Sequence, residues 1–421
     1  MKLVKLSLAA AIAASALVSS ASAVALEEAI KDVDVSGWAW VRYQGSNSVV
    51  PGSWWKFKSV VNVKTKIDDN FFFLAGIRYG AGADKDGATM SDNGSTASDP
   101  QNAGKKFMLN QLLVGYNVGG TTIMAGRYHL GSFFTADMYG DGIKVVNTDV
   151  QGLTLAALWA DALEKDSDIG SLALGAVNGK TTADHNLYGV AAIGSYDPVA
   201  FQLWYAYLED VTKLFAAEVA LNFNVMDDFG MGVKAQYGFN KFDGKYVDYA
   251  KAADVEVGDS TFVGAEASIK PFGGELSAGY VYYKAKDGKA GLSSFEDNGA
   301  FISAGEELIA SQDMQSYSLY TGKNDYWFIK AGYKIPGSGV KLSADYLQGK
   351  FSKTPDDGGY KASEVVARVN YAYNKHLDFV TWYSYVKFKD DKTDAMFGGK
   401  DFKDEGHDKV HTFRAQARYK F

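Results

Sequence analysis

A strict alternation of apolar and polar residues, repeated in many separate segments, is the feature that most constrains how this chain can fold. In residues 411–421 the odd positions from Phe413 to Phe421 are mainly apolar, and the even positions between them are polar. A period of two is typical of a β-strand with one apolar and one polar face. One such segment also fits the edge strand of a soluble β-sandwich, so a single strand does not decide the fold class.

The same alternation recurs along the chain. Residues 55–64, 71–79, 327–334 and 340–346 each carry aromatic or aliphatic side chains on one face and mostly polar or basic ones on the other. Aromatic residues gather near the ends of the apolar faces, as they do in the girdles at the two interfaces of outer-membrane barrels. The pattern predicts strands whose apolar face meets lipid and whose polar face lines an aqueous interior.

The lengths of the apolar runs exclude membrane-spanning helices. After residue 23 no segment approaches the run of about 18 apolar residues that a transmembrane helix requires. The longest candidate, residues 153–163, is interrupted by Asp161. The chain has 26 Tyr, 25 Phe and 45 Gly but only 6 Pro, a composition that suggests β-structure with many turns. We therefore predict an all-β fold, a transmembrane antiparallel β-barrel.

The N-terminus has the pattern of a secretory signal peptide. Residues 1–23 contain Lys2 and Lys5, an apolar stretch over 6–18, and the small-residue site 21–23. Removing them leaves 41 basic and 50 acidic residues, a net charge of -9. This acidic balance argues against nucleic acid as a partner, and the lack of cysteine excludes disulfides and thiolate metal sites. We predict that residues 24–421 form one barrel domain.

Short and long connections alternate, which gives a strand count. Long polar stretches, predicted as extracellular loops, separate eight short turn-forming segments, predicted as periplasmic turns. Eight turns and nine loops join eighteen strands, with sixteen as the alternative. In lipid the sheet cannot keep free edges, so a first strand near 35–44 must pair with 410–421. Barrels of this size enclose a water-filled channel, which implies transport. The turn segments are 68–70, 118–120, 147–152, 197–199, 226–228, 271–274, 336–339 and 374–376; the long stretches include 80–105, 161–185, 240–258, 286–324 and 387–409.

Basic side chains concentrate on the predicted lumen face. They come from the first three and the last few strands, which become neighbours when the barrel closes, so they predict a basic wall. The alternative is that each charge is only a solvated spacer. The residues assigned to the lumen by this alternation are Arg42, Lys56, Lys58, Arg78, Arg368, Arg414 and Arg418.

The segment after Arg127, residues 129–142, is predicted to be the third outer loop. Its pair Phe133 and Phe134 could dock it against the inner wall. Arg127 is also assigned to the constriction. Folded inward, Asp137 and Asp141 would face the arginines and create a transverse field there, which sorts solutes by charge. An ordinary exposed loop is the alternative.

Carboxylates also raise the hypothesis of a calcium site. The pairs Glu296 with Asp297 and Glu306 with Glu307 lie in a long loop, and with Asp137 or Asp141 they could supply oxygen ligands. The spacing does not match an EF-hand, and solvated surface charge is the alternative.

Several segments together resemble the major outer membrane porins of Campylobacter and its relatives. The resemblance implies an eighteen-stranded homotrimer in the bacterial outer membrane, amid lipid and lipopolysaccharide, that passes small hydrophilic solutes and ions with a modest preference for cations. It also implies an inward-folded third loop and a calcium ion at the constriction, held by Glu306 and the Ser303 carbonyl with either Asp137 or Asp141. The matching segments are 26–37, 142–147, 152–157, 186–189, 304–307, 365–369, 382–386 and 419–421.

Two other functions remain as alternatives to a porin. An outer-membrane hydrolase would need an activated nucleophile beside a histidine. Only Asp184 with His185 imitates a dyad, and no serine is obviously placed beside His411. A structural barrel whose loops act as an adhesin is the second alternative. We expect a porin without enzymatic activity and without a required cofactor.

Overall fold

The computed structural model describes most of the chain outside its N-terminus and several loops. The predicted signal peptide, Asp137, and the pair Glu296 and Asp297 lie outside the described residues. The described residues are 33–47, 52–84, 107–135, 138–164, 176–177, 180–181, 184–226, 228–252, 257–286, 289, 300–309, 322–352, 360–389 and 409–421.

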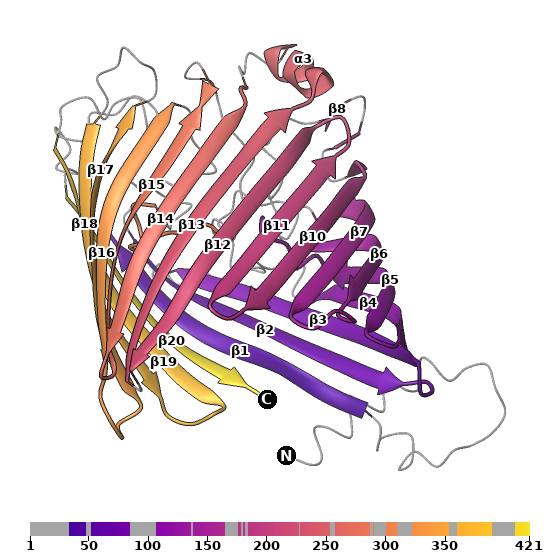
Figure 1. Cartoon of the computed structure of the whole chain (residues 1–421), viewed down its shortest axis with the longest axis horizontal. Coiled ribbons are helices and arrows are strands. Elements are labelled where there is room, and N and C mark those ends of the chain that lie inside the picture. Colours follow the sequence, from indigo (N-terminus) through magenta and orange to yellow (C-terminus); the bar gives the residue numbers. More distant parts are fainter. Residues whose placement is uncertain are drawn as a thin grey trace.

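Eighteen antiparallel strands form one closed barrel (Figure 1). Strands that are neighbours in sequence pair with each other, and β7 pairs with β10 because the short ribbon β8–β9 stands between them as a separate sheet. The barrel closes where β1 pairs with β20, from Trp38 with Lys420 to Ser46 with Thr412. The predicted fold, strand count and closure are therefore confirmed.

The barrel strands are nine to fifteen residues long, enough to cross a bilayer at a tilt. The one described helix, α3, lies between β13 and β14. The bounds are β1 Val33–Ser46, β2 Gly52–Lys66, β3 Phe71–Asp84, β4 Phe107–Val118, β5 Thr121–His129, β6 Tyr139–Asn147, β7 Leu153–Leu163, β8 Ala176–Val177, β9 Lys180–Thr181, β10 Leu187–Tyr196, β11 Val199–Leu208, β12 Thr212–Met226, β13 Phe229–Phe242, α3 Gly244–Ala252, β14 Ser260–Pro271, β15 Gly274–Ala285, β16 Lys323–Lys334, β17 Val340–Ser352, β18 Tyr360–Ala372, β19 Leu377–Phe388 and β20 Lys409–Lys420.

All eight predicted short turns join consecutive strands. In the β2–β3 turn the Asp68 carboxylate accepts hydrogen bonds from the backbone N–H groups of Asn70 (2.8 Å) and Phe71 (2.7 Å). These bonds lower the pKa of Asp68. Not every connection at the other end is long, because only residues 47–51 join β1 to β2 and only 209–211 join β11 to β12.

The third outer connection is shorter than the sequence predicts. We expected a loop over residues 129–142, but β6 begins at Tyr139, and Gly140 and Asp141 pair with Tyr128 and Arg127 of β5. The loop, which we call L3, is therefore residues 130–138. Gly140 and Gly142, which fall inside the predicted loop, lie within a paired strand.

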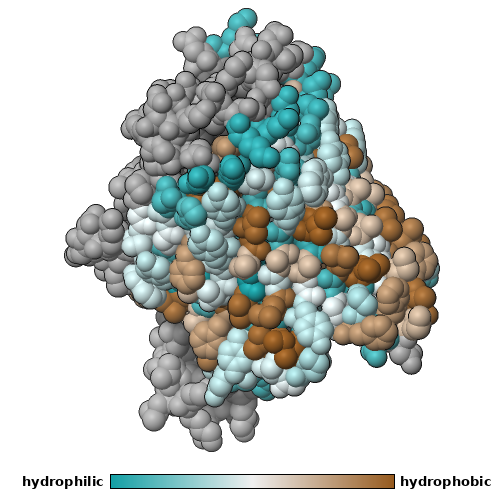
Figure 2. Space-filling view, turned by 90° about the vertical axis from the view of Figure 1, so that its left-hand side faces the viewer, coloured by the Kyte–Doolittle hydropathy of each residue, from teal (hydrophilic) through white to brown (hydrophobic). Residues whose placement is uncertain are grey.

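The outer surface carries the apolar faces of the strands. Leu112, Val190, Val233 and Ile329 are 42–55% exposed there, while their sequence neighbours face inward. Figure 2 shows hydrophobic residues gathered across the middle of the visible side, with hydrophilic residues above them. None of the helices in the described part of the chain is long and apolar enough to cross a membrane. The apolar strand faces are the surface that meets lipid.

Candidate functional site inside the barrel

L3 lies inside the barrel. Its side chains Leu130, Phe133, Phe134 and Met138 are each 1% exposed. The loop is closed by a hydrogen bond from the Leu130 N–H to the Met138 carbonyl (2.9 Å). The ammonium of Lys144 on β6 donates to the Leu130 carbonyl (2.8 Å) and ties the loop to the inner wall. The aromatic pair is thus buried, as the hypothesis of an inward-folded loop requires.

A second connection also enters the barrel. The resemblance placed its residues Ser303 and Glu306 at the constriction, but no local pattern indicated that this connection folds inward. It joins β15 to β16, and we call its described part, residues 300–309, the L7 segment. The Ala300 N–H donates to the Phe133 carbonyl of L3 (2.9 Å). The Phe301 ring lies 4.9 Å from that of Phe133 and 4.5 Å from that of Phe262 on β14. L3 and the L7 segment therefore form one structure across the lumen.

The side chain of Gln236 on β13 holds the near end of the L7 segment. Its amide donates to the Ala300 carbonyl (2.9 Å), and its oxygen accepts from the Ile302 N–H (2.7 Å). The bond to the Ile302 N–H is buried, and this N–H without its partner would cost about 1–3 kcal/mol. Gln236 is 3% exposed, so the contact is enclosed.

A buried carboxylate on β18 holds the far end. Glu364 is 0% exposed and accepts hydrogen bonds from the backbone N–H groups of Glu306 (2.8 Å), Glu307 (3.0 Å) and Leu308 (2.8 Å). Ser384 on β19 donates to the same carboxylate (2.7 Å). Successive N–H groups that converge on one anion form a nest, an arrangement that suits negative charge. Glu364 therefore fixes the path of the L7 backbone.

Arg368 lies further along β18, on the same inward face as Glu364, and completes this attachment. Its guanidinium contacts Glu306 Oε1 (2.5 Å), Asp345 Oδ1 on β17 (2.9 Å) and the Gly305 carbonyl (3.0 Å). Asp345 also accepts from the Gly305 N–H (3.1 Å). Two carboxylates, those of Glu306 and Asp345, therefore contact one guanidinium at this edge of L7. The predicted lumen residue Arg368 is therefore an anchor of the loop.

The predicted basic wall lies on β20, β1 and β2. Its cations alternate with tryptophans, and Arg42 stacks on Trp40 (4.5 Å from guanidinium carbon to ring centroid) as Arg418 stacks on Trp38 (5.3 Å). Cation–π contacts of this kind hold long side chains flat against a surface. Lys56 and Lys58 pair in register with Arg42 and Trp40, and Arg414 stacks on Trp382 of β19 (4.7 Å).

Arg78 is not part of that wall. It forms an ion pair with Glu164, at the end of β7, and both residues are 7% exposed. The Arg78 guanidinium also lies 5.9 Å from the ring of Tyr139. The sequence analysis did not single out Glu164, because its partner is 86 residues away and the end of a strand gives no signal of such a contact.

Arg127 and Asp141 form an ion pair with each other (2.8 Å) rather than facing the lumen. They pair in register on β5 and β6, where neighbouring Gly140 turns its Cβ position towards Leu130 of L3. Ile143, two residues after Asp141, is 43% exposed on the outer surface. Alternation therefore places Asp141 and Arg127 on the outer face near the rim, and the prediction that they line the constriction is corrected.

The residues of the calcium hypothesis are only partly brought together. Ser303 and Glu306 lie in the L7 segment, but Glu306 already contacts Arg368. Asp141 is remote from them by its outward position, and Asp137 lies outside the described residues. Among the described residues, no three His, Asp or Glu side chains are grouped in a way that could hold a metal ion. Calcium binding therefore stays a prediction.

Below the L7 segment the lumen is polar. A cavity of about 660 Å³ is lined by Ser303, Gly305 and Arg368 together with charged side chains from β12 to β17. Ion pairs cross it between strands that are separated by a third strand, Lys330 on β16 with Glu266 on β14 (2.9 Å) and Lys341 on β17 with Glu275 on β15 (2.5 Å). A charged space of this size holds many water molecules. The interior is thus an aqueous channel narrowed by L3 and the L7 segment.

A closed antiparallel barrel with an apolar outer face, a charged aqueous interior and loops folded inside it is the architecture of an outer-membrane porin. A family model, the Campylobacter major outer membrane protein, matches residues 1–421. The chain belongs to this family, and it is a porin of the bacterial outer membrane.

Solved structures of similar fold are porin barrels of other bacteria. Acinetobacter baumannii OccAB2 is 14% identical, with 93% of this chain and 98% of that chain covered and a TM-score of 0.69. Pseudomonas aeruginosa OpdL is 13% identical, with 93% and 99% covered and a TM-score of 0.69. P. aeruginosa OpdK, solved with vanillate, is 14% identical, with 93% and 99% covered and a TM-score of 0.67. At these identities the likeness shows the fold alone. No curated protein matches the chain.

Proposed function

We propose that this porin passes small hydrophilic solutes and ions by passive diffusion, with a modest preference for cations. The observation that carries the proposal is one row of register partners across the lumen wall. Arg368 pairs with Trp382, Trp382 with Arg414, and Arg414 with Gln44. Because adjacent strands are about 4.8 Å apart, three strand spacings place the acidic edge of the L7 segment and the basic wall within roughly 15 Å of each other, at nearby levels of the pore.

Opposite charges at nearby levels of the pore create a transverse field. Such a field orders water and favours small polar solutes over apolar ones. The preference for cations follows from the carboxylates that pair with arginines and offset their positive charge. Arg78 and Arg368 each contact a carboxylate, and Arg368 contacts two, those of Glu306 and Asp345. The net charge of -9 on the mature chain acts in the same direction.

The test is single-channel conductance of the refolded mature protein in a planar bilayer under a salt gradient. We expect stepwise ohmic openings and a reversal potential of the sign that cations give. An anion-signed potential would contradict the cation preference while leaving diffusion intact. A silent barrel would contradict diffusion and favour a structural or adhesive barrel.

We also infer a homotrimer set in lipid and lipopolysaccharide, as the family resemblance implies. The mass of the detergent-solubilised complex, measured by light scattering, should equal three chains, and a stable monomer would oppose the inference.

We infer no enzymatic activity. Turnover of peptide or phospholipid substrates by the pure barrel, lost on changing His185, would refute that part.

Calcium at the constriction is a further proposal on the same basis. Glu306 and the Ser303 carbonyl would hold the ion, and Asp137 is the remaining aspartate candidate because Asp141 faces outward. Calorimetric titration of the pure protein with calcium should give saturable heat that Glu306→Gln and Asp137→Asn reduce. A titration with heat of dilution only would remove the proposal.

A further inference from the structure

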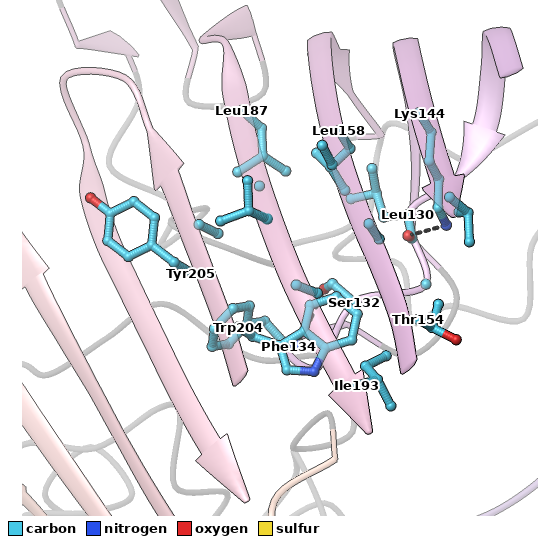
Figure 3. Close-up of a pocket in the computed structure, with 18 residues that line it drawn as sticks. Leu130, Ser132, Phe134, Lys144, Thr154, Leu158, Leu187, Ile193, Trp204 and Tyr205 are labelled. Carbon is cyan, nitrogen blue, oxygen red and sulfur yellow. Dashed lines mark hydrogen bonds between the residues drawn. The ribbon is translucent and has the colours of Figure 1, made fainter. Parts of the chain in front are cut away.

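An apolar cavity of about 200 Å³ lies between L3 and the barrel wall (Figure 3). It is separate from the polar cavity below the L7 segment, and no lining residue is shared between them. Leu130 and Phe134 of L3 line one side. Leu158, Ala191 and Trp204, from β7, β10 and β11, line the other. Nothing in the diffusion of hydrophilic solutes requires an apolar space of this kind.

The cavity exists because small side chains meet on adjacent strands. Ala191 on β10 pairs in register with Ala156 on β7 and with Trp204 on β11. Beside them, Gly189 pairs with Ala206 and lies against Leu158. Larger side chains at both ends, Leu158 and Trp204, keep L3 away from this recess. Figure 3 shows Trp204 and Phe134 together at one end of the cavity and Leu158 and Leu187 at the other.

Water fills such a space poorly. A buried water molecule needs two to four polar partners, and the lining offers few, because Ser132, Thr154 and Lys144 are its polar side chains. A dry apolar cavity of about 150 Å³ is large enough for benzene. A cavity of about 200 Å³ therefore accepts one aromatic ring with a small substituent. Phe134 and Trp204 supply flat apolar faces for such a ring.

One charged group lies at the edge of the cavity. Lys144 donates to the Leu130 carbonyl (2.8 Å) and to the His129 carbonyl (3.3 Å). An ammonium group has three donors. Among the described residues, two of the three Lys144 donors are used in these bonds, and the third N–H is directed to neither carbonyl. The approach of the ammonium depends on Gly131, since a Cβ there would lie 3.3 Å from Lys144 Nζ.

From this combination we propose that the cavity is a binding site for a single-ring organic acid. The ring occupies the space between Phe134, Leu158 and Trp204, and the carboxylate accepts a hydrogen bond from the ammonium of Lys144. A charge-assisted hydrogen bond away from bulk water is among the stronger polar contacts. Because L3 forms one side of the site, the ligand stabilises the loop that narrows the pore.

The test uses benzoate as the probe and the full detergent-solubilised barrel. Calorimetry should show saturable binding of one benzoate per chain, and acetate, which has no ring, should not bind. Benzamide has the same shape without the charge, and it should bind at least about tenfold more weakly because it cannot form the charge-assisted hydrogen bond with Lys144.

Two variants separate the cavity from the pore. Ala191→Leu fills the recess and should abolish benzoate binding while the single-channel conductance without ligand stays that of the wild type. Ala220→Leu is the matched control, an alanine that lines the lower cavity instead, and it should bind benzoate normally. Absence of saturable benzoate binding, or unchanged affinity in Ala191→Leu, would overturn the proposal. Equal affinity for benzamide would overturn the role of Lys144.

Discussion

At the scale of single residues, the L7 segment depends on one carboxylate. Changing Glu364 to Gln keeps the size of the side chain but replaces one acceptor oxygen by a donor. At least one of the N–H groups of Glu306, Glu307 and Leu308 then loses its partner. A buried unpaired N–H costs about 1–3 kcal/mol, so the loop should loosen. Single-channel recording should show higher and noisier conductance, whereas Glu275→Gln, an exposed pair member, should resemble wild type.

The contact between the Glu364 carboxylate and the L7 segment can also be tested by a change at Gly305, which acts through the backbone. Its φ is 79°, and a Cβ there would overlap the carboxylate of Glu364. Gly337, in the β16–β17 turn, has a φ of 72° but open space around its Cβ position. Both alanine variants carry the strain of positive φ, roughly 1 kcal/mol. Only Gly305→Ala should also change the conductance, and equal traces from the two variants would contradict the contact.

At the scale of elements, the junction of L3 and the L7 segment should set the pore width. Phe301 is 6% exposed and contacts the rings of Phe133 and Phe262. Truncating a buried phenylalanine to alanine costs about 3–5 kcal/mol. Phe301→Ala should therefore raise conductance and speed the uptake of larger sugars into liposomes, while Phe223→Ala on the outer surface should not. Identical uptake would show that the junction does not limit the pore.

The β2–β3 turn gives a pH dependence. Backbone N–H bonds lower the pKa of Asp68 below its ordinary value of about 3.9. Because this pKa is lower in the folded state than in the unfolded state, the charged carboxylate stabilises the fold at pH values above its ordinary pKa. The contribution disappears as the pH falls through the folded-state pKa. Asp68→Asn should unfold at lower temperature than wild type at pH 7, and the two should converge once the pH has fallen below the lowered pKa of Asp68. Asp69→Asn, in the same turn, is the control, and a constant gap at all pH values would oppose this account.

The elements show how far sequence alone could lead. The alternation of apolar and polar residues, together with the turn residues, predicted eighteen strands and eight turns. This was possible because every strand in lipid must present an apolar face outward and pair its backbone with its neighbours. The L7 segment could not be found in this way. Its anchors, Gln236 and Glu364, are 66 and 58 residues from their partners Ile302 and Glu306, and no local pattern encodes such contacts. Asp141 was misplaced because the predicted loop ran to residue 142, whereas β6 begins at Tyr139.

At the scale of the whole molecule, closure of the barrel decides which charges face the pore. β20 and β1 are the ends of the described chain, and their pairing brings Arg418 of one beside Trp40 of the other, with Arg414 beside Gln44. Arg127, in contrast, lies on the outer face with Asp141. Three arginines that look alike in sequence therefore have different access to the lumen, and selectivity should respond to them differently.

Removing charge from the basic wall should strengthen the preference for cations. In the double variant Arg414→Gln with Arg418→Gln, the acidic edge of the L7 segment is opposed by less positive charge, so the reversal potential should move further in the cation direction. Because exposed charges are screened within about 10 Å at 0.1 M salt, the shift should be larger in dilute salt. Arg127→Gln removes the same charge from the outer face and should leave the potential unchanged. An equal shift from Arg127→Gln would mean that total charge, rather than the face each arginine occupies, governs selectivity.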